Sequence, residues 1–233
     1  IALAKKIKVT VPGDVGEVKL NGNKIFYVGH SQGGNTGSLF VPFGDDLAGA
    51  VLSGTGGSLV LGLMGKKAPY DARAGLQGAF QELSIDETHP VLHLIQWYFE
   101  DIDPLLYADK LYRNTAGEPV HTAHVYGQND SYTPPATSRI FAAATGGTLA
   151  MPSEPPPEWF DKIEDLSMEA MVLQGEGLKG NREVNGKPVT GVTLQALNDA
   201  SRRVQPDMSC AAGEPYDGHF VLFRDCDLHR RLR

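Results

Sequence analysis

The 233-residue sequence has no long hydrophobic run and no excess of basic charge. Its longest apolar stretches, such as Leu59 to Met64, fall far short of the roughly 20 residues that a membrane-spanning helix needs. Lysine and arginine number 21 against 28 acidic residues, which gives a formal net charge of −7. Nucleic-acid binding requires clustered basic charge, so this balance argues against a nucleic-acid partner. We therefore expect a soluble globular chain without a transmembrane segment.

Cysteine is scarce as well, with Cys210 and Cys226 as the only two. The count alone is compatible with one disulfide in an exported protein or with two free thiols in a cytosolic one. The first residue is Ile1 rather than methionine, so the start looks processed and the lack of a signal peptide says little about compartment. Together with the acidic charge, the cysteine pair favours a secreted or periplasmic protein.

Glycine and proline are abundant, at 27 and 15 residues, and they follow no period. This composition disfavours a coiled coil or helical bundle and favours a sheet with many turns. Apolar and β-branched runs predict strands, and apolar residues three and four apart over Val91 to Phe99 predict a helix. The predicted strands are Ile25 to Val28, Leu47 to Leu52, His121 to Tyr126, Glu169 to Leu173 and Gly191 to Leu197. Strands that alternate with helices predict an α/β fold with a mostly parallel sheet and flanking helices.

The motif Gly29-His30-Ser31-Gln32-Gly33 fits G-x-S-x-G between a predicted strand and a predicted helix. A serine on so sharp a turn has a strained backbone, so Gly29 and Gly33 are both expected to need almost no side chain. The turn lifts the hydroxyl out of the sheet, and the Gln32 amide at the helix start can stabilise an oxyanion. The pattern predicts Ser31 as a nucleophile, and an ordinary glycine-rich turn is the alternative.

With this motif and the strand Leu47 to Leu52 after it, the chain resembles the α/β-hydrolase family, in particular its bacterial esterase-like and lipase-like members. The resemblance covers most of the chain in order and implies the chain order nucleophile, acid, histidine. It implies that Asp130, just after the strand His121 to Tyr126, is the acid and that His219 is the base. The alternatives from the residues alone are Asp101 and Asp103 for the acid and His229 for the base.

The resemblance also implies an activity. It implies a serine hydrolase that cleaves carboxylic esters through a Ser–His–Asp triad and an acyl-enzyme intermediate. No metal or organic cofactor is expected, and the expected substrate is a small-molecule ester or a lipid. Two alternatives stay open: a peptidase or amidase with the same triad, and a non-catalytic binding domain on the hydrolase scaffold.

The chain departs from the family in two places. It separates Asp130 from His219 by 89 residues, so within a single domain, 1–233, we expect an insertion over 151–190. Only 30 residues precede Ser31, where the family places several strands. The N-terminal part of the sheet is therefore expected to be missing from this chain. An N-terminal segment or a partner chain would complete the sheet and supply the second oxyanion amide.

Two further expectations concern the surroundings of the site. Residues 58–115 are expected to form a helical cap, whose apolar side chains either line an acyl pocket or pack within the cap. These side chains are Trp97, Tyr98, Phe99, Leu105 and Leu106. We also predict that Cys210 and Cys226 form a disulfide that brackets the loop carrying His219.

Overall fold

A computed structural model describes residues 2–13, 16–112, 118–153, 155–163, 166, 168–170 and 178–231. Its centre is a six-stranded sheet in the order β3-β4-β5-β10-β6-β7, in which every neighbouring pair is parallel. The strands are β3 (Ile25–His30), β4 (Leu47–Ser53), β5 (His121–Gly127), β6 (Thr148–Met151), β7 (Met168–Ala170) and β10 (Gly191–Ala196). The prediction of an α/β fold with a mostly parallel sheet is confirmed.

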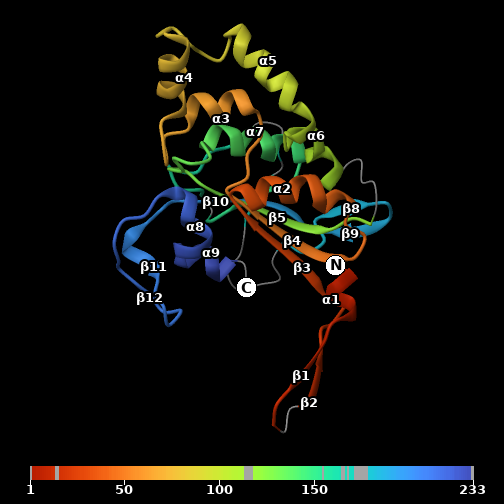
Figure 1. The fold of residues 1–233 in the computed structure, drawn as a ribbon. Coiled ribbons are helices and arrows are strands. Elements are labelled where there is room, and N and C mark those ends of the chain that lie inside the picture. The colour runs from red at the N-terminus through yellow and green to blue at the C-terminus, as the bar shows by residue number, and fades with distance from the viewer. Residues whose placement is uncertain are drawn as a thin grey trace.

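Helices cover the sheet, as predicted (Figure 1). One layer contains α2 (Gln32–Phe40), α3 (Leu59–Gly65), α6 (Leu105–Ala108) and α7 (Pro135–Thr145), and below the sheet in this view lie α8 (Val221–Arg224) and α9 (Cys226–Arg231). Above the first layer stand α4 (Ala72–Phe80) and α5 (Pro90–Phe99). None of the helices in the described part of the chain is long and apolar enough to cross a membrane.

Three apolar clusters hold these layers together. Leu52 and Phe141 belong to the cluster under α2, α6 and α7, whereas Val125 and Leu194 belong to the one under α8 and α9. Successive strand side chains point to opposite faces, which is how these strands feed both clusters. The third cluster, Val60, Met64, Ile85 and Leu92, joins α3 to α5. Residues 58–112 thus have a small core of their own beside the main one.

Strand β3 forms one edge of the sheet. Among the described residues no strand pairs with its outer side, and the side chains of Phe26 and Val28 are 65% and 63% exposed. The chain before it contains α1 (Ala2–Lys6) and an antiparallel hairpin of β1 (Lys8–Val11) with β2 (Gly16–Lys19). This hairpin extends away from the sheet (Figure 1). An apolar edge strand of this kind is a template for pairing with another strand.

Some short elements differ from the predicted ones. β7 spans Met168–Ala170, and the remainder of the predicted strand to Leu173 lies outside the described residues. A hairpin of β8 (Arg182–Val184) and β9 (Lys187–Val189) lies within the stretch 151–190, where no such strands were predicted. A small pair, β11 (Arg203–Val204) with β12 (Cys210–Ala211), follows it. Each of these strands has only two or three residues, too few for an alternating pattern to be visible in the sequence.

Candidate active site

Ser31 occupies the sharp turn between β3 and α2 in a strained conformation. Its backbone angles are φ 56° and ψ −122°, a region that residues other than glycine rarely adopt. Two backbone hydrogen bonds hold it there, from Ser31 N to Ser53 O at 2.8 Å and from Asn35 N to Ser31 O at 3.0 Å. The strain is therefore maintained by the neighbouring strand and by the first turn of the helix.

The glycines around this turn have unequal roles. A Cβ on Gly29 would lie 2.4 Å from Gly33 O, and one on Gly34 would lie 2.1 Å from Thr55 Oγ1, so both positions exclude a side chain. On Gly33 a Cβ would meet nothing within 4 Å. The expectation that Gly33 must lack a side chain is therefore wrong, because its Cα faces open space. Gly34, which faces the loop after β4, is the position that must lack a side chain instead.

Asp130 and His219 form a buried pair. Asp130 Oδ2 lies 2.8 Å from His219 Nδ1, and the two side chains are only 1% and 4% exposed. The other carboxylate oxygen, Oδ1, accepts hydrogen bonds from the backbone amides of Tyr132 at 2.8 Å and Thr133 at 2.7 Å. A carboxylate oxygen accepts hydrogen bonds, so this geometry suits a tautomer of His219 in which Nδ1 carries the hydrogen and donates it to Asp130.

Close backbone contacts join the two loops that carry this pair. A Cβ on Gly127 would lie 2.2 Å from Gly218 O, and one on Gly218 would lie 2.5 Å from Asn129 C. Asp217 adds side-chain links, because its carboxylate accepts hydrogen bonds from His219 N, Ser131 N and Ser131 Oγ. Glycine at both positions thus allows loops that are distant in sequence to meet.

Two aromatic side chains that were not predicted from the sequence, Tyr132 and His30, pack against His219. The Tyr132 ring stacks on it at 4.7 Å with an interplanar angle of 18°, and the His30 ring lies 4.5 Å away. The His30 ring also lies 4.8 Å from that of Phe223, and its Nδ1 lies 3.2 Å from Ser53 Oγ. Burial, and then the proximity of His219, lower the pKa of His30. The sequence could have indicated both residues by their position, since His30 directly precedes Ser31 and Tyr132 lies two residues after Asp130.

The three alternative residues, Asp101, Asp103 and His229, lie in environments that differ from that of the Asp130–His219 pair. Asp103 is buried, and its carboxylate accepts hydrogen bonds from Ser58 N, Leu59 N and Leu105 N at 3.0–3.1 Å and from Gln96 Nε2 at 2.7 Å. It therefore ties α3 to the segment 96–105. Asp101 is exposed. His229 Nε2 lies 2.6 Å from Leu222 O, a contact within the C-terminal helices. None of the three is paired as Asp130 and His219 are.

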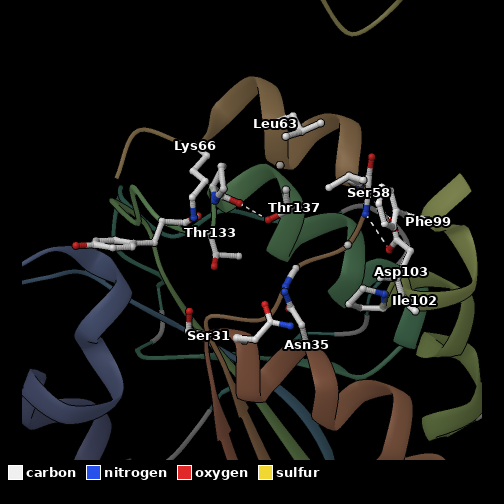
Figure 2. A pocket seen from close by; sticks show the side chains of 18 of the residues that line it. Ser31, Asn35, Ser58, Leu63, Lys66, Phe99, Ile102, Asp103, Thr133 and Thr137 are labelled. Atoms are coloured by element: carbon white, nitrogen blue, oxygen red, sulfur yellow. Dashed lines mark hydrogen bonds between the residues drawn. The ribbon is translucent and has the colours of Figure 1, made fainter. Parts of the chain in front are cut away.

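A cavity of about 490 Å³ opens beside Ser31. Figure 2 shows Ser31 and Asn35 at its base and Lys66, Thr133 and Thr137 around its upper part. Of the aromatic residues expected to line an acyl pocket, Phe99 does so, whereas Trp97 and Tyr98 are 74% and 78% exposed. They lie on the outer face of α5, because the apolar residues that face inward on this helix, such as Leu92, pack against α3.

The structure brings Asp130 and His219 together and places both near the turn of Ser31. His219 contacts the neighbours of Ser31. Its ring packs on that of His30, and a Cβ on Gly54 would lie 3.1 Å from His219 Cε1. Within the described chain, Ser31 Oγ makes no hydrogen bond to His219. Hydrogen bonds of this kind often form only when substrate is bound. The Gln32 residue begins α2, lines the cavity and presents the first amide after Ser31.

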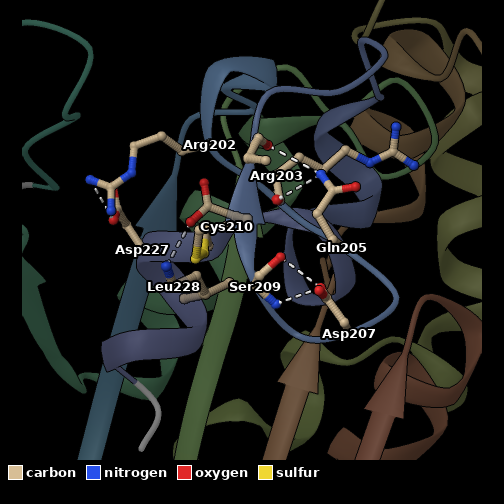
Figure 3. The surroundings of a disulfide bond; sticks show 11 residues. Arg202, Arg203, Gln205, Asp207, Ser209, Cys210, Asp227 and Leu228 are labelled. Atoms are coloured by element: carbon tan, nitrogen blue, oxygen red, sulfur yellow. Dashed lines mark hydrogen bonds and ion pairs between the residues drawn. A yellow bond between two sulfur atoms is a disulfide. The ribbon is translucent and has the colours of Figure 1, made fainter.

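The disulfide between Cys210 and Cys226 is present, as predicted. It joins β12 to the first residue of α9, with a Cα–Cα distance of 5.9 Å, and so closes the loop that contains His219 (Figure 3). Beside it, Arg202 pairs with Asp227 at 3.1 Å. The disulfide thereby ties the β11–β12 pair to α9, which packs against the sheet through Leu228.

No family model matches the sequence, and no curated protein matches it. Among solved structures, the chain is similar to an acylaminoacyl peptidase of Pyrococcus horikoshii, with 11% identity over 78% of this chain and 21% of the other, at a TM-score of 0.40. It is also similar to acetyl xylan esterase 1 from a Thermoanaerobacterium species, with 13% identity, 78% and 42% coverage and a TM-score of 0.39. The chain thus spans less than half of either protein. At these scores the similarity assigns neither a family nor a function.

Proposed function

We propose that this protein is a serine hydrolase that cleaves carboxylic esters. The observation that carries the proposal is the buried hydrogen bond between Asp130 and His219, at 2.8 Å, beside a serine held at φ 56°. A carboxylate that orients a neutral imidazole, next to a serine on a strained turn, is the constellation of nucleophilic acyl transfer. The cavity beside Ser31 gives a small ester room to bind.

In the proposed reaction Ser31 Oγ attacks the carbonyl carbon of the ester while His219 Nε2 takes the hydroxyl proton. Asp130 holds the imidazole in the required tautomer and stabilises its protonated form. The Gln32 N–H donates to the oxyanion of the tetrahedral intermediate. His219 then gives the proton to the leaving alcohol, and water hydrolyses the acyl-Ser31 ester by the same steps. The role of each residue requires no metal or organic cofactor.

A fluorophosphonate probe tests the nucleophile. The full-length protein should be labelled, and Ser31→Ala should abolish labelling because the probe reacts only with an activated serine. Ser58→Ala is the matched control, since Ser58 lines the same cavity and should leave labelling intact. Asp130→Asn should lower ester turnover by about 10⁴-fold, because it favours the wrong histidine tautomer. Labelling that persists in Ser31→Ala would refute the assignment, whereas an amide panel cleaved faster than esters would favour a peptidase.

We also propose that another polypeptide segment pairs with the free edge of β3 and supplies the second oxyanion donor. The exposed side chains of Phe26 and Val28 on this edge support the proposal. Sedimentation of the 233-residue chain alone should show self-association, and a monodisperse monomer with full ester turnover would contradict it. The disulfide supports a secreted or periplasmic location, which fractionation of the producing cells can test.

A further inference from the structure

Lys66 is a cationic residue in the wall of the cavity. It follows directly after α3 as its C-terminal cap residue and is half-buried. In Figure 2 its side chain extends from the end of α3 into the cavity, on the side where Ser31 lies, with Thr133 beside it. This position is unusual for a lysine, because a strongly hydrated ammonium group normally remains in bulk water.

The contacts of Lys66 hold the ammonium group without neutralising it. Its Nζ donates a hydrogen bond to Tyr132 O at 3.2 Å and lies 5.7 Å and 5.9 Å from the ring centroids of Tyr132 and Tyr70. In the described part of the chain Lys66 has no acidic partner, in contrast to the adjacent Lys67, which pairs with Asp71 at 2.8 Å. An ammonium group has three N–H donors, so two remain for a ligand.

The acidic residue in the cavity wall does not cancel this charge at the Ser31 side. Asp103 lies at the opposite side of the cavity from Lys66 (Figure 2), and its oxygens accept the four hydrogen bonds described above. Asn35 and Thr137, which lie between them in Figure 2, are uncharged polar residues. Asp130 is buried against His219 and does not line the cavity, so Lys66 is the charged side chain of the cavity wall on the Ser31 side.

We propose that Lys66 binds an anionic group of the substrate, so that the preferred substrates are esters whose acyl part carries a carboxylate. This inference rests on the proposed esterase function and specifies its substrate class. The two tyrosine rings and the Tyr132 carbonyl keep the ammonium group in place, which lowers the entropic cost of ordering a flexible side chain on binding. A charge-assisted hydrogen bond to a carboxylate inside a cavity is stronger than a neutral one.

A matched pair of substrates tests the proposal on the full-length protein. Monomethyl glutarate and methyl pentanoate have similar acyl size, but only the first carries a carboxylate. The wild type should favour the glutarate ester in kcat/KM, and Lys66→Met should lower the ratio of the two kcat/KM values by about 10- to 100-fold, chiefly through KM. Lys66→Arg should restore most of the ratio because it retains the charge. Lys67→Met, the adjacent control, should leave the ratio unchanged.

The outcomes separate this inference from the proposed function. If the ratio is the same in the wild type and Lys66→Met, Lys66 does not select the substrate, although the enzyme remains an esterase. If neither ester is hydrolysed, the proposed function fails, and ligand-detected NMR on Ser31→Ala still tests the anion site. There, monomethyl glutarate should bind at least tenfold more tightly than methyl pentanoate, and Lys66→Met should remove that difference. Equal binding of the two esters would overturn the proposal.

Discussion

Substituting Gly127 by alanine should displace His219 from Asp130. Gly127 is the last residue of β5, and an added Cβ would lie 2.2 Å from Gly218 O and 2.7 Å from Gly218 C. Both contacts are with backbone, so no side-chain rotation relieves them. Ordinary contacts at a Cβ begin at about 3.4 Å. The peptide group of Gly218, which directly precedes His219, must therefore move by about 1 Å.

Asp130 cannot follow this movement, because the Tyr132 and Thr133 amides hold its Oδ1. The distance from His219 Nδ1 to Asp130 Oδ2 should grow from 2.8 Å to about 3.8 Å, beyond the range of a hydrogen bond. A misplacement of about 1 Å in a catalytic group can cost about 10²-fold in rate. We therefore expect Gly127→Ala to lower kcat/KM for an ester by about 10²-fold. The overpacking should also lower the free energy of unfolding by about 1–3 kcal/mol.

Steady-state ester hydrolysis and urea denaturation measure the two effects separately. Gly75→Ala is the matched control, since Gly75 lies within α4 and a Cβ there meets nothing within 4 Å. It should leave kcat/KM unchanged and raise the free energy of unfolding by up to about 1 kcal/mol. A folded Gly127→Ala variant with the wild-type kcat/KM would show that this contact does not position His219.

Burial lowers the pKa of the His124 imidazole to about 4. As the pH falls below about 6.5, this imidazole is therefore protonated in the unfolded chain but not in the folded one. The free energy of unfolding should consequently decrease by about 3 kcal/mol by pH 4. Urea denaturation across this pH range should show that the free energy of unfolding depends less on pH in His124→Gln than in the wild type. An identical pH dependence in the two proteins would contradict a lowered pKa for His124. The disulfide closes a loop of sequence separation 16, so replacing both cysteines by serine should lower the free energy of unfolding by about 3 kcal/mol. Calorimetry that finds no decrease in Tm for this double variant would refute that estimate.

The strands β3, β4, β5 and β10 were predictable because each is rich in apolar, β-branched or aromatic residues, and most residues of β4, β5 and β10 are buried. β4 and β10 each differ from their predicted spans by one residue, at the C-terminal end. The hairpins β1–β2 and β8–β9 were not predicted. Their signals are present in the sequence, because Ile7 to Val11 alternates apolar and polar residues and Asn185-Gly186, at φ 53° and 73°, is typical of a two-residue hairpin turn.

The sequence by itself determined the local features of the candidate site. The strand Ile25 to His30 contains Gly29 and runs directly into Ser31 and a glycine-rich helix start, so the sequence locates the sharp turn at Ser31. Tertiary structure decided which distant residues meet there. Asp130 pairs with His219 because Gly127 and Gly218 allow two loops to touch. Lys66 reaches the same cavity only because α3 packs over the loop of Tyr132. Such contacts depend on how whole elements pack, and no local pattern of residues encodes them.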